Sequence, residues 1–122
     1  MRATPVIRTA EPRKPSSLFL ESPSSSENDP SDETPIALTV TAIRVIIRGS
    51  APSVDLSIRF GPDRSAAGTE IIVGGVTATS TTTGDVFTTL TNPLIPANSH
   101  IWMTITALTG TVVSIRATVV YA

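Results

Sequence analysis

The sequence predicts an all-β protein: an antiparallel β-sandwich of jelly-roll type with a flexible N-terminal arm. Apolar and polar residues alternate with a period of two along several short runs. Clusters of Gly, Pro and Thr separate these runs, and no apolar period of 3.6 residues continues for more than a turn or two. Short alternating strands bounded by such turns are typical of sandwiches and jelly rolls.

Residues 1–35 are predicted to form the arm, and residues 36–122 the folded domain. Six prolines are spread along the arm, and each fixes its own φ and removes a hydrogen-bond donor. From Ser22 to Thr34 the chain is almost entirely Ser, Pro and acidic residues. Such a composition buries too little apolar area to offset its ordering entropy, so we expect no independent fold there.

Leu18, Phe19 and Leu20 form an apolar island within this arm. They could fold back onto their own domain, dock on a second copy of the chain, or dock on a different protein. Large apolar residues on a flexible segment commonly become ordered on binding, and the tether from Leu20 to Ile36 spans roughly 20 Å as a coil. We therefore predict that these three residues are an anchor that binds a partner.

The domain begins with a strand region rich in β-branched residues from Ile36 onward. Its apolar positions shift by one residue between Ala42 and Ile43, which indicates a bulge or a strand that passes from one sheet to another. The next run, residues 53–61, alternates without interruption. Its predicted core face consists of Val54, Leu56, Ile58 and Phe60.

Loops and short strands occupy the middle of the domain. Gly61, Pro62 and Asp63 have the chemistry of a turn. A strand is predicted over residues 69–79, interrupted by a bulge or turn at its paired glycines 74 and 75. A further short strand is expected over residues 86–91.

The last third is predicted to be a hairpin, with strands over residues 101–108 and 112–121. Both strands alternate, and their apolar sets must share one face. A two-residue loop would place Ile105 opposite Ser114, whereas a three-residue loop places Ile105 opposite Ile115. We therefore expect a three-residue loop in which Gly110 or a neighbour has a positive φ.

This register directs Trp102 outward, away from the predicted core. Aromatic residues are enriched in contact surfaces between proteins. Trp102 could pack on a neighbouring subunit, stack on a sugar ring or lie beneath a loop of its own chain. We treat it as a candidate interface residue.

Charge and composition narrow the partners of the 122-residue chain. Its net charge of −1 is unlike the basic balance of proteins that bind nucleic acid. No run of about 18 apolar residues is present that could span a membrane, and residues 1–15 lack the apolar stretch of a signal peptide. The absence of cysteine excludes disulfides and suits a reducing cytoplasm. We expect neither nucleic acid nor a membrane as a partner, and oligomerisation as a support for the small core.

Few residues could carry out chemistry. The single histidine, His100, precedes a predicted strand, and we expect it to be structural. Asp63, Glu70 and Asp85 lie in or beside loops and could meet around a calcium ion, but their spacing matches no loop motif such as the EF-hand. We predict no catalytic residue, metal site or cofactor, and hence a protein that is not an enzyme.

Two segments resemble small all-β virion structural proteins of tailed bacteriophages. They are "IRFGPDRSAAGTEIIVGGVTATSTTTGDVF" and "NPLIPANSHIWMTITALTGTVVSIRATVVYA". In that group a strand leads into a "GxDRSAAGTE"-type loop, and an "IPA(N/G)S.IW" segment precedes the final hairpin. The resemblance covers roughly residues 55–122 and contains no catalytic motif.

What the resemblance implies is a capsid decoration, or cement, protein. Such a protein is often a jelly-roll trimer that binds the major capsid protein on the outer capsid surface of the virion, after assembly in the host cytoplasm. The alternative is a carbohydrate- or receptor-binding sandwich of a phage tail, baseplate or head spike. These alternatives differ in their contacts: the first needs an arm or a strand face that binds protein, the second an exposed aromatic platform.

Overall fold

The computed structural model describes residues 16–21, 23 and 28–122. Within these residues all regular structure is β, and the strands are linked into one antiparallel sheet, which confirms the predicted all-β class. The strands are β1 (Ser16–Glu21), β2 (Asn28–Thr34), β3 (Leu38–Gly61), β4 (Thr69–Glu70), β5 (Val76–Ala78), β6 (Asp85–Phe87), β7 (Leu94–Ile95) and β8 (Ser99–Tyr121). No helix long and apolar enough to cross a membrane occurs in the described part of the chain.

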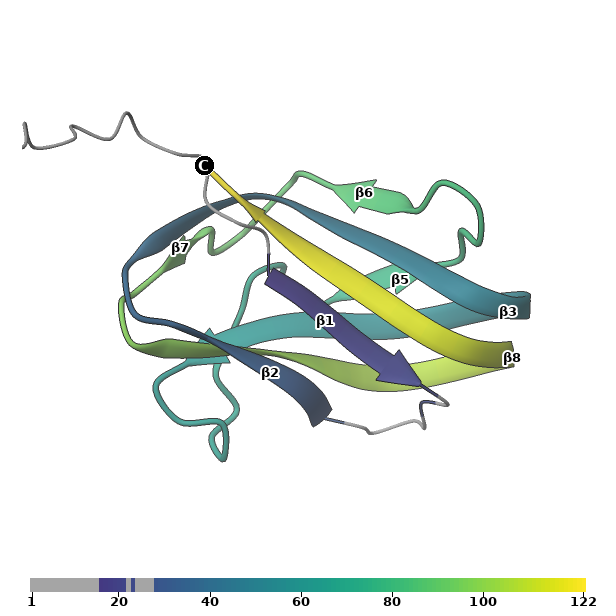
Figure 1. The fold of residues 1–122 in the computed structure, drawn as a ribbon, viewed down its shortest axis with the longest axis horizontal. Coiled ribbons are helices and arrows are strands. Elements are labelled where there is room, and N and C mark those ends of the chain that lie inside the picture. Colours follow the sequence, from purple (N-terminus) through teal and green to yellow (C-terminus); the bar gives the residue numbers. More distant parts are fainter. Residues whose placement is uncertain (1–15, 22, 24–27) are drawn as a thin grey trace, which may run out of the picture.

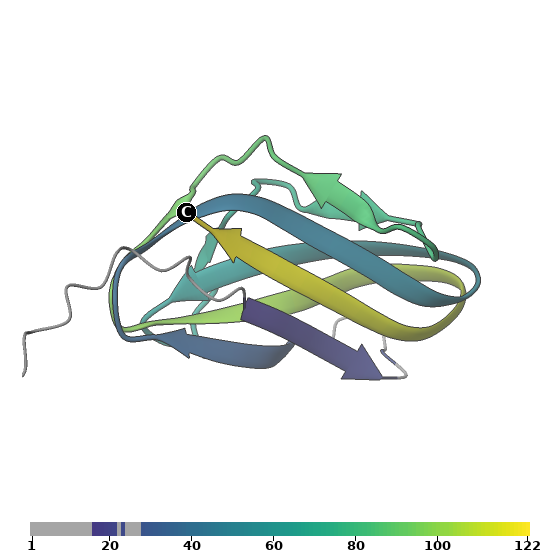
Figure 2. The ribbon, with the colours of Figure 1, turned by 45° about the horizontal axis from the view of Figure 1, so that its top comes forward.

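The centre of the fold is a ribbon of two long strands, β3 and β8. They pair antiparallel from Val40 opposite Tyr121 to Gly61 opposite His100. At one end both strands turn back (Figures 1 and 2), and the pairing register shifts there between Arg48 and Ser53. We call residues 40–48 with 114–121 the first half-ribbon, and residues 53–61 with 100–109 the second half-ribbon.

The corner between the half-ribbons depends on Gly110. Its φ is +69°, a left-handed conformation that side chains other than glycine rarely adopt. A Cβ at this position would collide with the carbonyl oxygen of Ala51 on the facing strand. The predicted positive φ at Gly110 is therefore confirmed, and its cause is the close approach of the two strands.

Short strands flank each half-ribbon on both sides (Figure 1). Beside the first half-ribbon, β1 pairs with β8 and β6 pairs with β3. Beside the second, β2 pairs with β8, while β4 and β5 pair with β3. Strand β7 pairs with Leu38 and Thr39 at the start of β3.

Both half-ribbons send their inward side chains into one core. The predicted core face of residues 54–60 is confirmed, because all four of its apolar residues are buried. The predicted phase slip is also confirmed, since the register shifts between Val40 and Ala42 and leaves Thr41 as an extra residue. The largest of its fully buried side chains are Leu18, Ile43, Ile47, Leu56, Ile71, Ile95, Ile101, Met103, Ile105 and Ile115.

The predicted C-terminal hairpin is wrong. Strand β8 is continuous, and β3 supplies the partner for both of its segments: Ile105 lies opposite Leu56, and Ile115 lies opposite Ile47. The inference that the two apolar sets share a face was correct, because Ile105 and Ile115 are both buried in the same core. Alternation fixes which side chains share a face, but it does not identify the strand that supplies the hydrogen bonds.

The predicted boundary at residue 35 also differs from the structure. Two segments assigned to the arm, β1 and β2, are strands of the sheet. Pro30 in β2 falls within a register shift between Asn28 and Ser31, and a bulge is one of the few places where a strand tolerates proline. The prediction of an extended arm otherwise falls on residues 1–15, 22 and 24–27, which lie outside the described residues.

Candidate functional site

The predicted anchor residues are divided between the two faces of β1. Leu18 is 1% exposed and Leu20 is buried in the core, whereas Phe19 is 40% exposed. Leu18 and Leu20 are therefore buried by their own chain and do not await a partner, which corrects the prediction for these two. Alternation along a strand is the reason, because neighbouring side chains point to opposite faces of the sheet.

A hydrogen bond fixes β1 beside the C-terminal end of β8. The hydroxyl groups of Ser16 and Tyr121 lie 2.6 Å apart in a buried position. The strand register then places Phe19 opposite Arg116. Phe19 is thus held at a defined place on the outer face of the first half-ribbon, which leaves it as the one anchor residue available for a contact.

Three arginines lie on the same outer face, on the two strands next to β1 in the sheet. Arg116 lies between Phe19 on β1 and Ile46 on β3. Arg44 and Arg48 lie two residues to either side of Ile46, so their side chains point to the same face, and all three arginines are exposed. We call this surface the arginine face; it consists of Phe19, Arg44, Ile46, Arg48 and Arg116.

The arginine face is positively charged and has shallow hollows. The Arg116 guanidinium lies 5.2 Å from the centre of the Phe19 ring, which is a cation–π distance. None of the three arginines forms an ion pair with any described residue. A hollow of about 300 Å³ is lined by Phe19, Ile46, Arg48, Ser114 and Arg116, and one of about 180 Å³ adjoins Arg44. Guanidinium groups in this arrangement can bind carboxylates through paired hydrogen bonds.

Trp102, the other predicted contact residue, is 1% exposed. It lies beneath a loop of its own chain, because a Cβ on Gly61 would be 3.6 Å and one on Gly68 only 2.6 Å from its ring. Trp102 was expected on a neighbouring subunit, on a sugar ring or beneath a loop of its own chain, and the structure shows the last of these. A stacking contact with a sugar or a neighbouring subunit would require the loop to move.

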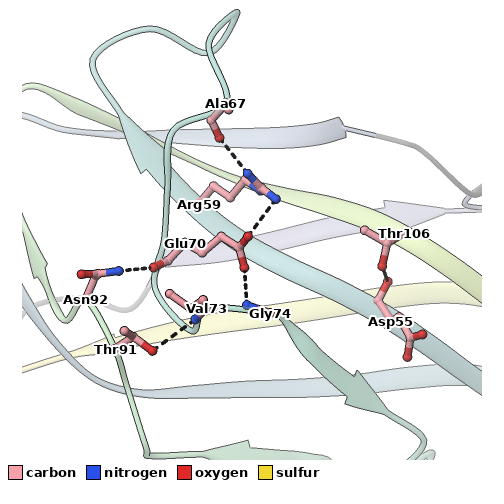
Figure 3. A network of polar contacts seen from close by, with 9 residues as sticks. All are labelled: Asp55, Arg59, Ala67, Glu70, Val73, Gly74, Thr91, Asn92 and Thr106. Carbon is pink, nitrogen blue, oxygen red and sulfur yellow. Dashed lines mark hydrogen bonds and ion pairs between the residues drawn. The ribbon is translucent and has the colours of Figure 1, made fainter.

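A polar network ties the loops to the second half-ribbon (Figure 3). Arg59 and Glu70 form an ion pair at 3.1 Å, and Arg59 also donates to the Ala67 carbonyl at 3.0 Å. The Gly74 amide donates to the Glu70 carboxylate at 2.8 Å, and the Asn92 side chain donates to the Glu70 carbonyl at 2.8 Å. Glu70 therefore joins three segments of the chain, which gives its carboxylate a structural role.

The other two carboxylates considered as calcium ligands are held in separate turns. Asp63 accepts hydrogen bonds from the hydroxyl and amide of Ser65, which lower the pKa of Asp63 below its ordinary value of 3.8. Asp85 accepts bonds from the amides of Thr79 and Ser80 at 2.9 and 3.0 Å. No group of three or more possible metal ligands is brought together in the described part of the chain.

A polar hollow lies beside the network shown in Figure 3. Its volume is about 300 Å³, and its walls include Asp55, Arg59, Glu70 and the Gly74–Gly75 turn. Ser57 lines the hollow and is only 4% exposed, yet its hydroxyl has no hydrogen-bond partner among the described residues. A buried hydroxyl without a partner is costly, so a small opening of the covering turn would let a polar ligand in the hollow bond to it. Sequence alternation placed Ser57 on an outer face but did not indicate that a loop covers it.

His100 lies in β8 opposite Gly61 and is half-buried. The structure places it at the start of that strand, as expected from its position in the sequence.

No protein-family profile matches the chain, and no curated protein or solved structure matches it.

Proposed function

We propose that this chain is a non-enzymatic structural protein of a bacteriophage particle, of the capsid decoration type. It would bind the major capsid protein on the outer surface of the virion. The observation that carries this proposal is an exposed aromatic residue, Phe19, held beside three exposed arginines that form no ion pair with any described residue. Aromatic residues and arginine are the residue types most enriched where proteins bind one another.

The finer architecture that we propose is a two-layer sandwich of jelly-roll type. In support, the β3–β8 ribbon turns back at the corner near Gly110, and each half-ribbon has flanking strands on both sides. The inward residues of both halves belong to one core. A solution structure with interlayer contacts between Ile105 and Ile115 would support it, and their absence would contradict it.

Association into a trimer is part of the proposal. A small cysteine-free core gains stability from association, and several linked copies bind a repetitive lattice more tightly than one copy does. Light scattering during size-exclusion chromatography measures the oligomeric state directly.

The decisive experiment is co-sedimentation with expanded heads of the phage that encodes the chain. We expect saturable binding to heads, and higher resistance of the decorated heads to heat. A chain lacking residues 1–15 should bind more weakly but still fold, because β1 begins at Ser16. Failure of the complete chain to sediment with heads would refute the decoration role.

The polar hollow favours one alternative, a carbohydrate- or receptor-binding module. The unpartnered hydroxyl of Ser57 and the nearby Asp55 and Glu70 carboxylates could bond to the hydroxyl groups of a sugar. Titration with mono- and disaccharides, followed by amide NMR, should then move the signals of Ser57 and Gly75. Ser57→Ala is the matched variant. Trp102 fluorescence should stay constant, because its ring is covered.

A further inference from the structure

We propose that the arginine face docks on an acidic surface of another protein, with Arg116 at the centre of the contact and Phe19 as the aromatic residue beside it. This inference rests on the proposed structural role and adds to it the face that is used and the chemistry of the partner. Its basis is the juxtaposition of one exposed ring and three exposed guanidinium groups on three adjacent strands.

The arrangement places apolar and cationic side chains side by side, with Arg116 in the middle and Phe19 on the edge strand β1. Phe19, Arg116 and Ile46 form one row across β1, β8 and β3. Arg48 lies in the row on one side and Arg44 in the row on the other. An aromatic side chain and arginines in adjacent positions are the residue types most enriched where proteins bind one another.

The charge of the face is local and unbalanced. The complete chain has a net charge of −1. The three exposed arginines are therefore a local cluster of positive charge on a chain that is not basic overall. Glu21 lies at the rim, in the row of Arg48, with Ser114 between them. Asp85 on the flanking strand β6 accepts two amide bonds in its own turn. Carboxylates from a partner would therefore find three guanidinium groups that no described carboxylate engages.

An acidic protein fits this face better than a nucleic acid does. Single-stranded nucleic acids require several aromatic platforms and an extended basic groove, whereas this face has one exposed ring. The negative net charge supplies no general attraction for a polyanion. The apolar residues Phe19 and Val86, 40% and 52% exposed, match side chains of a protein surface.

Two variants with the same change in net charge test the face. The first replaces Arg44, Arg48 and Arg116 by glutamine, which removes three positive charges and keeps polar side chains. The control replaces Ala66, Val73 and Ala97 by glutamate; these are exposed loop residues outside β1, β3 and β8. Any difference between the two variants then reports the position of the charge and not its total.

The measurement is amide NMR titration with three probes: a peptide of alternating glutamate and leucine, polyglutamate, and oligo-dT. We expect the first peptide to shift the signals of Phe19, Ile46 and Arg116, with an affinity that falls as salt rises. The glutamine variant should bind it about tenfold or more weakly, as for charge pairs at a protein contact. The control should bind like the unaltered chain. Equal binding by all three proteins, no binding by the unaltered chain, or tighter binding of oligo-dT at these residues would overturn the inference.

Co-sedimentation of the same variants with phage heads separates this inference from the proposed function. If the unaltered chain and the glutamine variant bind heads equally, the decoration role stands and the docking face is wrong. If the unaltered chain binds the acidic peptide at this face but never binds heads, the face stands and the decoration role is wrong.

Discussion

The outer faces of the two half-ribbons differ, although their inner faces share one core. On the first half-ribbon the outer face is open, and Phe19 and the three arginines are exposed. On the second half-ribbon part of the outer face is covered, so that Trp102 and Ser57 are buried there, whereas Asp55 and Thr106 stay exposed. The same two strands thus form an accessible surface at one end of the ribbon and a partly protected one at the other.

The loops explain the difference. The chain that follows β3 returns over the second half-ribbon, and Gly68 and Gly75 allow its backbone to approach closely. The first half-ribbon is bordered by the short strands β1 and β6, which extend the sheet sideways. A sheet face that the described residues leave uncovered is available to a second protein, whereas a covered face contributes to stability.

The largest expected effect is on the covered face. Trp102→Ala removes a fully buried ring beneath the loop that contains Gly68 and should lower the free energy of unfolding by about 3–5 kcal/mol. Urea denaturation followed by circular dichroism measures this. Trp102→Phe is the control and should lose less. A loss below about 1 kcal/mol for Trp102→Ala would show that the loop does not cover the ring in solution.

Neighbouring residues of β1 should behave oppositely. Leu18→Ala creates a cavity in the core and should cost about 2–5 kcal/mol of unfolding free energy. Phe19→Ala removes a ring that is 40% exposed and lies outside the core, so it should cost about 1 kcal/mol or less, mainly its contact with Arg116. Denaturation curves of the two variants test this pair. Equal losses of unfolding free energy in the two variants would mean that β1 does not pack on the core as the structure has it. Leu18 and Leu20 would then remain available to a partner.

The sequence predicted the faces of strands better than their neighbours. The core face at Val54 and Leu56 and the bulge near Ala42 follow from local alternation, which any single strand displays. Pairing is a long-range property, and nothing in the local pattern of β8 showed that β3 would continue as its partner through the corner. The hairpin is the simplest arrangement in which the two alternating apolar sets share a face. The alternation alone does not exclude a ribbon of two long strands that folds back on itself.

The site was only partly predictable for the same reason. Leu18, Phe19 and Leu20 stand out in the sequence as an apolar island. Their Ser- and Pro-rich neighbours, however, conceal the strand alternation that puts Phe19 on the opposite face from the two leucines. That alternation spans only the six residues of β1, which is too short to detect against Ser- and Pro-rich neighbours. The arginine face was not predicted, because Arg44 and Arg116 are distant in sequence and only the strand register brings them to one face.

Two glycines test how tightly the loop covers the second half-ribbon. Gly68 has a φ of +70°, and a Cβ there would lie 2.6 Å from the Trp102 ring and 2.8 Å from the Phe60 carbonyl oxygen. Gly68→Ala should cost about 2–3 kcal/mol, from left-handed strain together with the clash. Gly74 has a φ of +89° and nothing within 4 Å of its Cβ position, so Gly74→Ala should cost only the strain, about 1–2 kcal/mol. Thermal or urea denaturation compares them, and the reverse order would contradict the close contact between loop and ring.

The smallest expected effect concerns the turn that begins the covering loop. The pKa of Asp63 lies below 3.8, first because the Ser65 hydroxyl donates to its carboxylate and second because the Ser65 amide does. A carboxyl group with a lowered pKa in the folded state adds stability above its ordinary pKa, and this stability is lost as the pH falls through the folded value. Ser65→Ala should therefore raise the pKa of Asp63 part of the way toward 3.8, because the amide bond remains. Carbon NMR titration of the Asp63 carboxyl measures it. Since that carboxyl is fully exposed, solvent screening should make the change in unfolding free energy the smallest of the four predicted here. An unchanged pKa of Asp63 in Ser65→Ala would mean that the hydroxyl bond is not formed in solution.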